Sequence, residues 1–505
     1  MTVIDEEDVI ASVADALQYI SYFHPPDYIR ALSEAYTLER GEAAKEAIAQ
    51  ILENSRLCAF ARRPICQDTG QVVVFARIGM GVQWRGARSF GAMVDEGVSR
   101  AYGHPANPLR ASIVNDPMFS RSGSGDNTPA IVHIELVPGE SVELDIAAKG
   151  AGSENKARLG MLNPGQSVAD WVVDAVPGMG AGWCPPGMLG VGVGGSAEKA
   201  VQLAKQSLMG PIDMARLRAR GAQTPIESLR LEICDRVNAL GIGAQGLGGL
   251  TTVLDVKILD FPTHAASLPV AVIPNCAATR HAHLVLDGAG PAKLAAPRLE
   301  DWPEITAKSS ASFRRVDLDR LDPAEVASWR SGERLLLSGK LLTARDAAHR
   351  RIDALARAGL PLPDGLKLDG RVLYYVGPVD PVDGEVVGPA GPTTATRMDP
   401  YMPMIAKLGV LATVGKAERG AEAIAAIRES RTAYLIAVGG AAYLVSKAIR
   451  SARLVAFPDL GMEAVRELQV EDMPVMVAVD AAGASIHIDA PSRWRRLLVR
   501  RSQTP

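Results

Sequence analysis

The stretch PICQDTGQVVVFAR, residues 64–77, joins a loop built around one cysteine to a run of β-forming residues. Proline and glycine bound the loop, and polar side chains stand directly beside the cysteine. Residues 71–77 contain three consecutive valines and a phenylalanine, which is typical of a strand. The stretch therefore predicts a strand of an α/β sheet that is preceded by a loop with a cysteine and polar side chains.

Helical and strand-like segments alternate on both sides of this stretch. The apolar residues of segment 9–20 recur at helical spacing, and a glycine-rich α/β region follows to about residue 285. Alanine, proline and charge then dominate residues 286–330, where periodicity fades. A second α/β unit follows, whose strand-like runs include residues 333–337 and 475–479. We expect an α/β fold with a larger N-terminal domain (1–285), a linker (286–330) and a smaller, swivelling C-terminal domain (331–505).

Composition excludes several classes of protein. Charges nearly balance, with 54 basic against 57 acidic residues, which argues against a nucleic-acid or acidic-membrane binder. No run of 18 apolar residues exists, so no membrane-spanning helix is expected. The acidic start of the chain resembles neither a signal nor a transit peptide. Five sparse cysteines make a disulfide framework improbable and favour a reducing, cytoplasmic location.

The five cysteines fall into two groups. Cys66, Cys184 and Cys276 stand beside proline, glycine or an amide, which indicates loops, whereas Cys58 and Cys234 lie in apolar, helix-like contexts typical of buried thiols. Three loop cysteines could converge on one metal centre, although spacing alone is weak evidence. Their spacing fits no structural zinc pattern.

Two glycine-rich segments match G-x-G-x-x-G. Residues 241–246 follow a helix and precede a strand, which is the reverse of a dinucleotide-binding loop, so we reject that reading. Residues 190–195 precede an expected helix from Ser196, but Pro185 and Pro186 leave little room for a full strand before them. An anion-holding turn and plain tight packing remain equally open for this segment.

Longer motifs cover nearly the whole chain. They are PICQDTG (64–70), KGAGSENK (149–156), CPPG (184–187), FPTH (261–264), IPNC (273–276), LSGKLLTARDAAH (337–349), GPVDP (377–381), GPTTATRMD (391–399) and VGK (414–416). Together and in this order they resemble the class I fumarases and the related tartrate dehydratases, with two subunits of some members fused into one chain. The resemblance implies a cytoplasmic, homodimeric hydro-lyase that carries an iron–sulfur cluster.

The resemblance also implies roles for individual residues. A [4Fe–4S] cluster normally has four thiolate ligands, and three leave one iron open to substrate. By resemblance the ligands are Cys66, Cys184 and Cys276. Asp68 is implied as the acid or base on the hydroxyl, Thr393 as the base on the carbon-bound proton, and His264 as an aid to proton transfer or binding. The implied substrate-binding residues are Gln67, Arg110, Gly152, Arg345, Thr394, Arg397 and Lys416.

Two departures from the family pattern affect the expected substrate. An Asn-Thr pair is replaced by Gly123-Ser124, and the last glycine of G-K-G is replaced by Ala417. Neither removes an expected catalytic group, but both could reshape the pocket. The leading hypothesis is the reversible hydration of fumarate to (S)-malate. The first alternative is the same chemistry on tartrate or mesaconate. The alternative of a different class is a non-enzymatic iron–sulfur sensor. Such a sensor would not need the retained Asp68, Thr393 and arginines.

Overall fold

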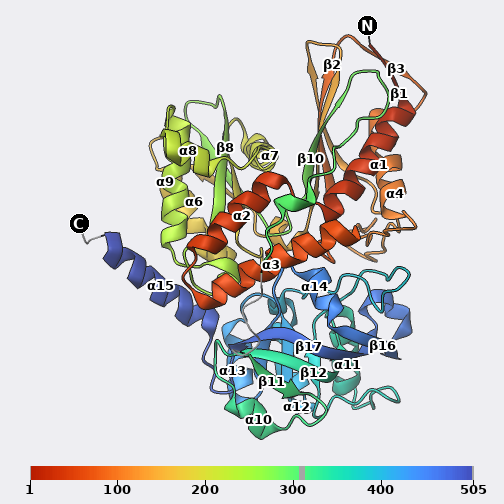
Figure 1. The fold of residues 1–505 in the computed structure, drawn as a ribbon, viewed down its shortest axis with the longest axis vertical. Coiled ribbons are helices and arrows are strands. Elements are labelled where there is room, and N and C mark those ends of the chain that lie inside the picture. Colours follow the sequence, from red (N-terminus) through yellow and green to blue (C-terminus); the bar gives the residue numbers. More distant parts are fainter. Residues whose placement is uncertain (1, 306–312, 503–505) are drawn as a thin grey trace.

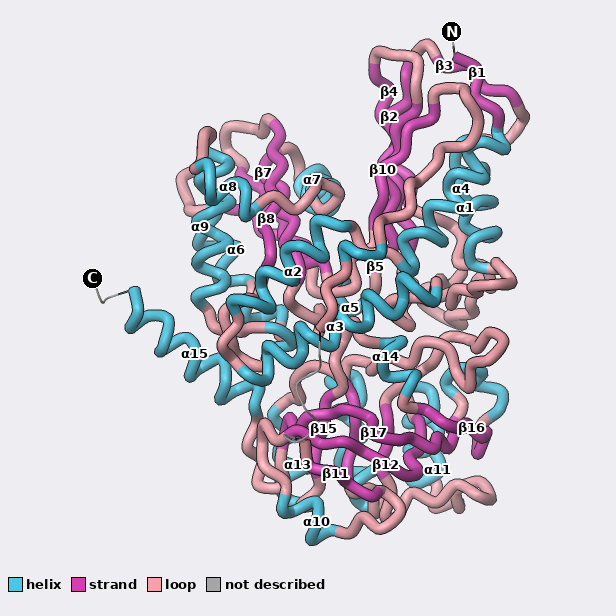
Figure 2. The backbone as a smooth tube through the Cα atoms, viewed as in Figure 1, coloured by secondary structure: helices cyan, strands magenta, loops and turns pink. Residues whose placement is uncertain are grey.

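The computed structural model describes residues 2–305 and 313–502, and its elements form an N-terminal part with two lobes above a C-terminal part with one large sheet (Figure 1). Helices and strands occur in all three units, which confirms the expected α/β class. The smooth backbone trace shows each sheet flanked by helices (Figure 2).

The first lobe is built on a four-stranded sheet of order β10-β5-β2-β4. Its long helix α1 (Glu6–Tyr22) packs against this sheet through Val13 and Leu17, which meet buried strand residues such as Val74. The expected helix at 9–20 and the expected strand at 71–77 are therefore confirmed. The other elements of the lobe are β1 (Thr2–Asp5), β2 (Gln71–Gly79), β3 (Val82–Arg85), α4 (Phe90–Tyr102), β4 (Ile131–Val137), β5 (Val142–Lys149) and β10 (His281–Leu286).

The second lobe contains a sheet of order β6-β9-β7-β8 covered by helices. No full strand precedes residues 190–195, as expected from Pro185 and Pro186, because the glycine-rich segment itself forms most of strand β7 (Gly187–Gly194). A Cβ at Gly190 or Gly192 would lie 2.0 Å from a carbonyl oxygen of helix α7 (Ala197–Ser207), so these glycines serve tight packing. The remaining elements are β6 (Arg158–Leu162), α6 (Val168–Ala175), η1 (Pro177–Met179), α8 (Met214–Arg220), α9 (Pro225–Ala239), η2 (Ala244–Gly246), β8 (Val253–Phe261) and β9 (Leu268–Asn275).

Helix α3 (Glu42–Ala61) crosses the base of the lobes, where it meets the C-terminal part, and helix α2 (Pro26–Leu38) packs against it (Figure 1). The fully buried Asn54 of α3 accepts hydrogen bonds from the N–H groups of Tyr443 and Leu444, both 2.9 Å long, at the start of helix α14 (Ala442–Lys447). Because these N–H groups lack helical partners, Asn54 joins the two parts by capping a helix.

The C-terminal part holds a seven-stranded sheet of order β11-β12-β13-β14-β15-β17-β16. Strands β12 to β15 run parallel, and β17 pairs antiparallel with β12, β15 and β16. The strands are β11 (Arg314–Asp317), β12 (Arg334–Thr343), β13 (Val372–Tyr374), β14 (Ala412–Gly415), β15 (Ala433–Ile436), β16 (Ile449–Ala456) and β17 (Val465–Val479). The remaining helices are η3 (Leu299–Asp301), α10 (Pro323–Ser328), α11 (Asp346–Arg357), η5 (Ala395–Tyr401), α12 (Met402–Lys407), α13 (Ala421–Ser430), η6 (Pro458–Glu463) and α15 (Ile486–Ser502).

The expected linker, residues 286–330, contains regular structure. Strand β11 pairs in parallel with β12, and α10 follows it, so this portion of the range belongs to the C-terminal sheet. Residues 306–312 of the range lie outside the described residues. In the described part of the chain, no helix is both long and apolar enough to cross a membrane.

Candidate active site

The carboxyl ends of the parallel strands β12 to β15 meet at one edge of the C-terminal sheet. Arg345 follows β12, Lys416 follows β14 and Gly439 follows β15. Ligand sites form at this edge in open α/β sheets because the loops after parallel strands gather there. In this chain the cysteine-bearing loops of the N-terminal part cover the same edge, so residues from both parts line one site.

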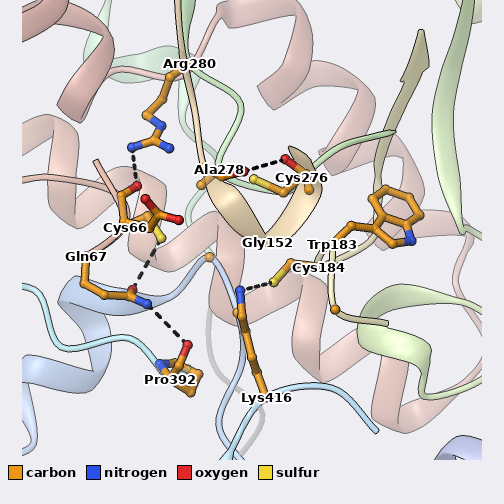
Figure 3. Close-up of a pocket in the computed structure, with 16 residues that line it drawn as sticks. Cys66, Gln67, Gly152, Trp183, Cys184, Cys276, Ala278, Arg280, Pro392 and Lys416 are labelled. Atoms are coloured by element: carbon orange, nitrogen blue, oxygen red, sulfur yellow. Dashed lines mark hydrogen bonds between the residues drawn. The ribbon is translucent and has the colours of Figure 1, made fainter. Parts of the chain in front are cut away.

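Three loops from different places in the sequence bring Cys66, Cys184 and Cys276 to one cavity of about 390 Å³. Their side chains project into the same space (Figure 3). The loops hold one another, since the N–H of Ala277 donates to the carbonyl of Cys184 at 3.0 Å. The buried His24 contacts the Ala277 carbonyl through Nε2 at 3.0 Å. The other two cysteines, Cys58 and Cys234, are buried as expected and line neither cavity, although Cys58 belongs to a small apolar cluster that Cys66 and Cys276 contact.

Cations surround the three thiols. The ammonium of Lys416 donates to the sulfur of Cys184 at 3.0 Å. Burial raises the pKa of Cys66 to about 11, while Arg280 and Lys416 act in the opposite direction. Burial alone would lower the pKa of Lys416, but the sulfurs of Cys184 and Cys66 outweigh it and raise that pKa. The cavity is therefore suited to groups that carry negative charge.

Asp68 lies at the rim where this cavity meets a second one. Its carboxylate accepts hydrogen bonds from the N–H groups of Ala151 at 2.9 Å and Gly70 at 3.2 Å. Burial raises the pKa of Asp68, but the charges of Arg110, Arg280 and Lys416 together with the Ala151 N–H outweigh it, so the pKa lies below its usual value. Asp68 is thus held as a carboxylate, the form that can accept a proton from water.

The second cavity, of about 740 Å³, carries an excess of positive charge. Asp68 is its only carboxylate in the described part of the chain, against five cations. The residues that line it are Gln67, Asp68, Arg110, Ala151, Gly152, Asn155, Lys156, Arg345, Pro392, Thr393, Thr394, Thr396, Arg397 and Lys416. Every substrate-binding residue expected from the sequence is in this set.

The three expected arginines differ in their partners. Arg110 donates to the carbonyl of Gly377 at 2.8 Å. Arg345 lies 3.4 Å from the carboxylate of Glu463, and burial lowers its pKa to about 10 against the opposing effect of Glu463. Arg397 makes a two-pronged ion pair with Asp346. Arg345 and Arg397 thus pair with carboxylates of the protein, whereas Arg110 makes no ion pair within the described residues, although its charge acts on nearby Asp68.

Thr393 is positioned by its backbone. Its N–H donates to the Tyr375 carbonyl at 2.7 Å, and its carbonyl accepts from the Lys416 N–H at 3.0 Å. The side chain of Thr394 makes no capping hydrogen bond to η5. Among the described residues, no hydrogen bond joins the Thr393 hydroxyl to Arg397 or Lys416, although all three line one cavity.

His264 is not brought to either cavity. It lies in an exposed loop between β8 and β9, where its Nδ1 accepts from the N–H of Ala266 at 3.1 Å. His349 is buried under the site, and its Nδ1 contacts the Arg345 carbonyl at 2.9 Å, which fits a structural role.

The two sequence departures occupy different environments. Gly123 and Ser124 lie in a surface loop that lines neither cavity, and the Ser124 hydroxyl accepts from the N–H of Asn127 at 3.0 Å. Ala417 directly follows Lys416 and has a positive φ of 68°, a region that favours glycine. The hydroxyl of the buried Tyr434 donates to the Ala417 carbonyl at 2.9 Å and holds this turn.

Arg280 and Glu418 are among the residues at or beside the site that sequence reasoning missed. Arg280 is almost fully buried, lines the cysteine cavity and donates to the Asp68 carbonyl at 2.6 Å (Figure 3). Glu418 accepts from the Ala181 N–H at 2.8 Å and so ties the Lys416 turn to the Cys184 loop. Arg280 lies four residues after Cys276 and Glu418 two after Lys416, and closeness to a motif was their only signal.

Comparisons with known proteins agree along nearly the whole chain. The family described as fumarate hydratase (Fumerase) matches residues 10–285, and the one described as fumarase C-terminus matches residues 288–490. Fumarate hydratase 2 of Leishmania major is 32% identical over 86% of this chain and 78% of its own length. Fumarate hydratase class I, aerobic, of Escherichia coli (strain K12) is 31% identical over 88% of this chain and 83% of its own length. A putative L(+)-tartrate dehydratase subunit alpha of Methanocaldococcus jannaschii is 34% identical over 54% of this chain and 94% of its own length.

Proposed function

This chain belongs to the class I fumarate hydratase family of hydro-lyases, and on that premise we propose that it interconverts fumarate and (S)-malate with a [4Fe–4S] cluster. The observation that carries the proposal is the single cavity lined by Cys66, Cys184 and Cys276, which opens beside Asp68 and a cation-rich second cavity. The cluster, the residue roles and the substrate are all part of this proposal.

The donor set fits a cluster better than a single ion. In the described ranges, no three Cys, His, Asp or Glu side chains are grouped as ligands of one metal ion. The thiolates of an iron–sulfur cluster need no such grouping, because each binds a different iron. Three thiolates would leave one iron open, and that iron would supply a Lewis acid for the substrate's carboxylate and hydroxyl. Cys66, Cys184 and Cys276 would hold the cluster.

Asp68 acts on the hydroxyl in this proposal. Its depressed pKa supports the base role on water in hydration, and the same carboxyl returns the proton to the departing hydroxyl in dehydration. The N–H groups of Ala151 and Gly70 orient the carboxylate. Gln67 is fixed by a hydrogen bond from Nε2 to the Pro392 carbonyl at 3.2 Å and lies beside Asp68 to orient the substrate.

Thr393 is proposed as the base on the carbon-bound proton. A threonine hydroxyl is too weakly acidic for this role unless nearby cations stabilise its alkoxide. Lys416 lines the same cavity, and its backbone N–H fixes the Thr393 carbonyl. His264 receives no step here because it lines neither of the two cavities of the site.

The remaining cavity residues suit a dicarboxylate. The guanidinium groups of Arg110, Arg345 and Arg397 match the geometry of carboxylates. When substrate binds, Arg345 would exchange the carboxylate of Glu463, and Arg397 that of Asp346, for a carboxylate of the substrate. Gly152 permits close approach, since a Cβ there would lie 3.2 Å from Nζ of Lys416. Its backbone N–H and the Thr394 hydroxyl complete the polar wall.

Tartrate and mesaconate are the alternative substrates of the same chemistry. The half-length similarity to a putative tartrate dehydratase subunit favours keeping tartrate in view. One methylene-sized difference in a pocket changes discrimination by only about 1–3 kcal/mol. Turnover of the reconstituted protein on the three acids tests the choice: fumarate should lead, and faster turnover of tartrate or mesaconate would overturn it. A cluster-loaded protein inert on all three would favour the sensor.

We also propose that the chain forms a homodimer in the cytoplasm. Exposed apolar side chains stand on two edge strands, β4 with Ile134 and Leu136 and β6 with Leu159 and Met161. Such edges are commonly covered by a partner. All five cysteines are free, which suits a reducing compartment.

A further inference from the structure

Among the five cations that line the second cavity, Lys156 differs from the others. Arg110 contacts the Gly377 carbonyl, Arg345 contacts Glu463, Arg397 contacts Asp346 and Lys416 contacts Cys184. Within residues 2–305 and 313–502, the Lys156 ammonium has neither a hydrogen bond nor an ion pair, although its side chain is only partly exposed. A half-buried cation is disfavoured without a counter-charge, so this ammonium is free to bind an anionic group.

The turn that carries Lys156 is held rigidly. The buried Lys149 donates to the Ser153 hydroxyl at 3.0 Å and to the Pro274 carbonyl at 2.6 Å. Glu154 forms an ion pair with Lys205 on helix α7. The Lys156 N–H itself donates to the Ser153 carbonyl at 3.1 Å. Because these contacts fix the backbone before any ligand arrives, binding through Lys156 would order little more than its own side chain.

The side chain of Lys156 lies along Gly182, at the seam between the two parts of the chain. A Cβ built on Gly182 would lie 3.1 Å from Cε and 3.6 Å from Nζ of Lys156. The same point would lie 3.5 Å from Cγ2 of Thr394. Lys156 and Thr394 thus flank Gly182, whereas Lys416 lies against Gly152 and the Cys184 thiol.

We propose that Lys156 is a further substrate-binding residue whose ammonium binds the dicarboxylate's carboxylate that lies away from the thiols, beside Thr394. This inference rests on the proposed function and assigns one more protein contact to its dicarboxylate substrate. Lys416 and Lys156 line the same cavity, Lys416 beside Gly152 and Lys156 beside Gly182, so each end of a four-carbon dicarboxylate could bind a cation of its own. Losing Lys156 removes one charge contact of the bound acid and leaves the groups at the reacting carbons in place.

The experiment compares Lys156→Gln and Lys156→Arg with Arg158→Gln in the reconstituted protein. Arg158 lies two residues from Lys156, is exposed and lines neither cavity. Its replacement by glutamine removes the same positive charge. Calorimetry measures binding of succinate, an unreactive dianion, and of its monoamide, and kinetics give kcat and KM for fumarate. We expect Lys156→Gln to weaken succinate binding about tenfold or more, to remove most of the preference over the monoamide and to raise KM more than it lowers kcat.

Lys156→Arg should keep most of the succinate affinity, and Arg158→Gln should match the wild type. Lys156→Met provides a second charge-free variant if the glutamine variant folds poorly. Wild-type succinate binding in both charge-free variants would overturn the inference. If the wild type converts no fumarate but binds succinate through Lys156, the proposed function fails and this inference stands. A wild type that binds no dicarboxylate would overturn both.

Discussion

The ammonium of Lys416 lies 3.0 Å from the sulfur of Cys184, across the seam between the two parts of the chain. Two residues later, Glu418 accepts from the Ala181 N–H at 2.8 Å, three residues before Cys184. One turn of the C-terminal part therefore holds one cysteine loop at two points. These two contacts, Lys416 with Cys184 and Glu418 with Ala181, fix the position of Lys416 in the site.

Replacing Glu418 by alanine should weaken both stability and activity. The buried Ala181 N–H would lose its partner, which costs about 1–3 kcal/mol, and Lys416 would lose its second anchor. Denaturant unfolding and kcat are the measurements. Glu422→Ala, four residues later and exposed, is the control and should change neither quantity. Equal stability and equal kcat in the two variants would show that the Glu418–Ala181 hydrogen bond does not position Lys416.

Replacing Asp68 by asparagine should abolish proton transfer to and from the hydroxyl while keeping the side chain's shape. The oxygen of the amide can still accept from the Ala151 N–H. We expect kcat to fall about 10²–10⁴-fold with a smaller change in KM. Iron content should remain that of the wild type. A variant with nearly normal kcat would require another acid–base group.

The role of Thr393 is tested by a pair of substitutions. Thr393→Val removes the hydroxyl at constant shape and should lower kcat about 10²–10⁴-fold, whereas Thr393→Ser keeps the hydroxyl and should retain more activity. Exchange of the carbon-bound proton of (S)-malate with solvent reports the step directly. Unchanged exchange in the valine variant would exclude Thr393 as the base.

Buried histidines should make the unfolding free energy depend on pH. Burial lowers the pKa of His24 to about 3 and that of His349 to about 4, while unfolding returns each towards about 6.5. Because the unfolded state then binds more protons, stability is complete above pH ~6.5 and falls as the pH drops below it, by up to about 1.4 kcal/mol per pH unit for each histidine.

Denaturant titrations of the metal-free protein between pH ~7 and ~5 measure this slope. His349→Asn should reduce it by about one proton, whereas His104→Asn, at an exposed position, should leave it unchanged. Equal slopes in the wild type and the His349 variant would contradict the assignment.

Sequence patterns predicted the elements whose local signal agrees with their final environment. The apolar spacing of α1 and the valine run of β2 were sufficient, because each buries one regular face. Strand β12 extends to Thr343, beyond the expected 333–337, because the chain continues through an irregularity between Leu337 and Gly339. Strand β17 was expected only at 475–479, since charged residues interrupt its earlier half.

Most residues expected at the site from the family motifs line the two cavities, whereas His264 of the FPTH motif lies in an exposed loop away from both. Their roles stay predictions. Residues that only folding brings to the site could not be found from a motif. Asn54 gave no signal, because its partners Tyr443 and Leu444 are far away in sequence. Lys156 stands inside a recognised motif, but only its free ammonium in the cavity distinguishes it.

The proposed function depends on Cys66, Cys184 and Cys276 holding an iron–sulfur cluster. The most direct test is iron bound per chain after anaerobic reconstitution, read together with fumarate–malate conversion, in the wild type and in each cysteine-to-alanine variant. We predict about four irons and rapid conversion in the wild type and in the Cys58 and Cys234 variants, and loss of conversion with depleted iron in the other three. A wild type that binds no iron would contradict this ligand assignment. So would full iron content and activity in a variant that lacks one of these three cysteines.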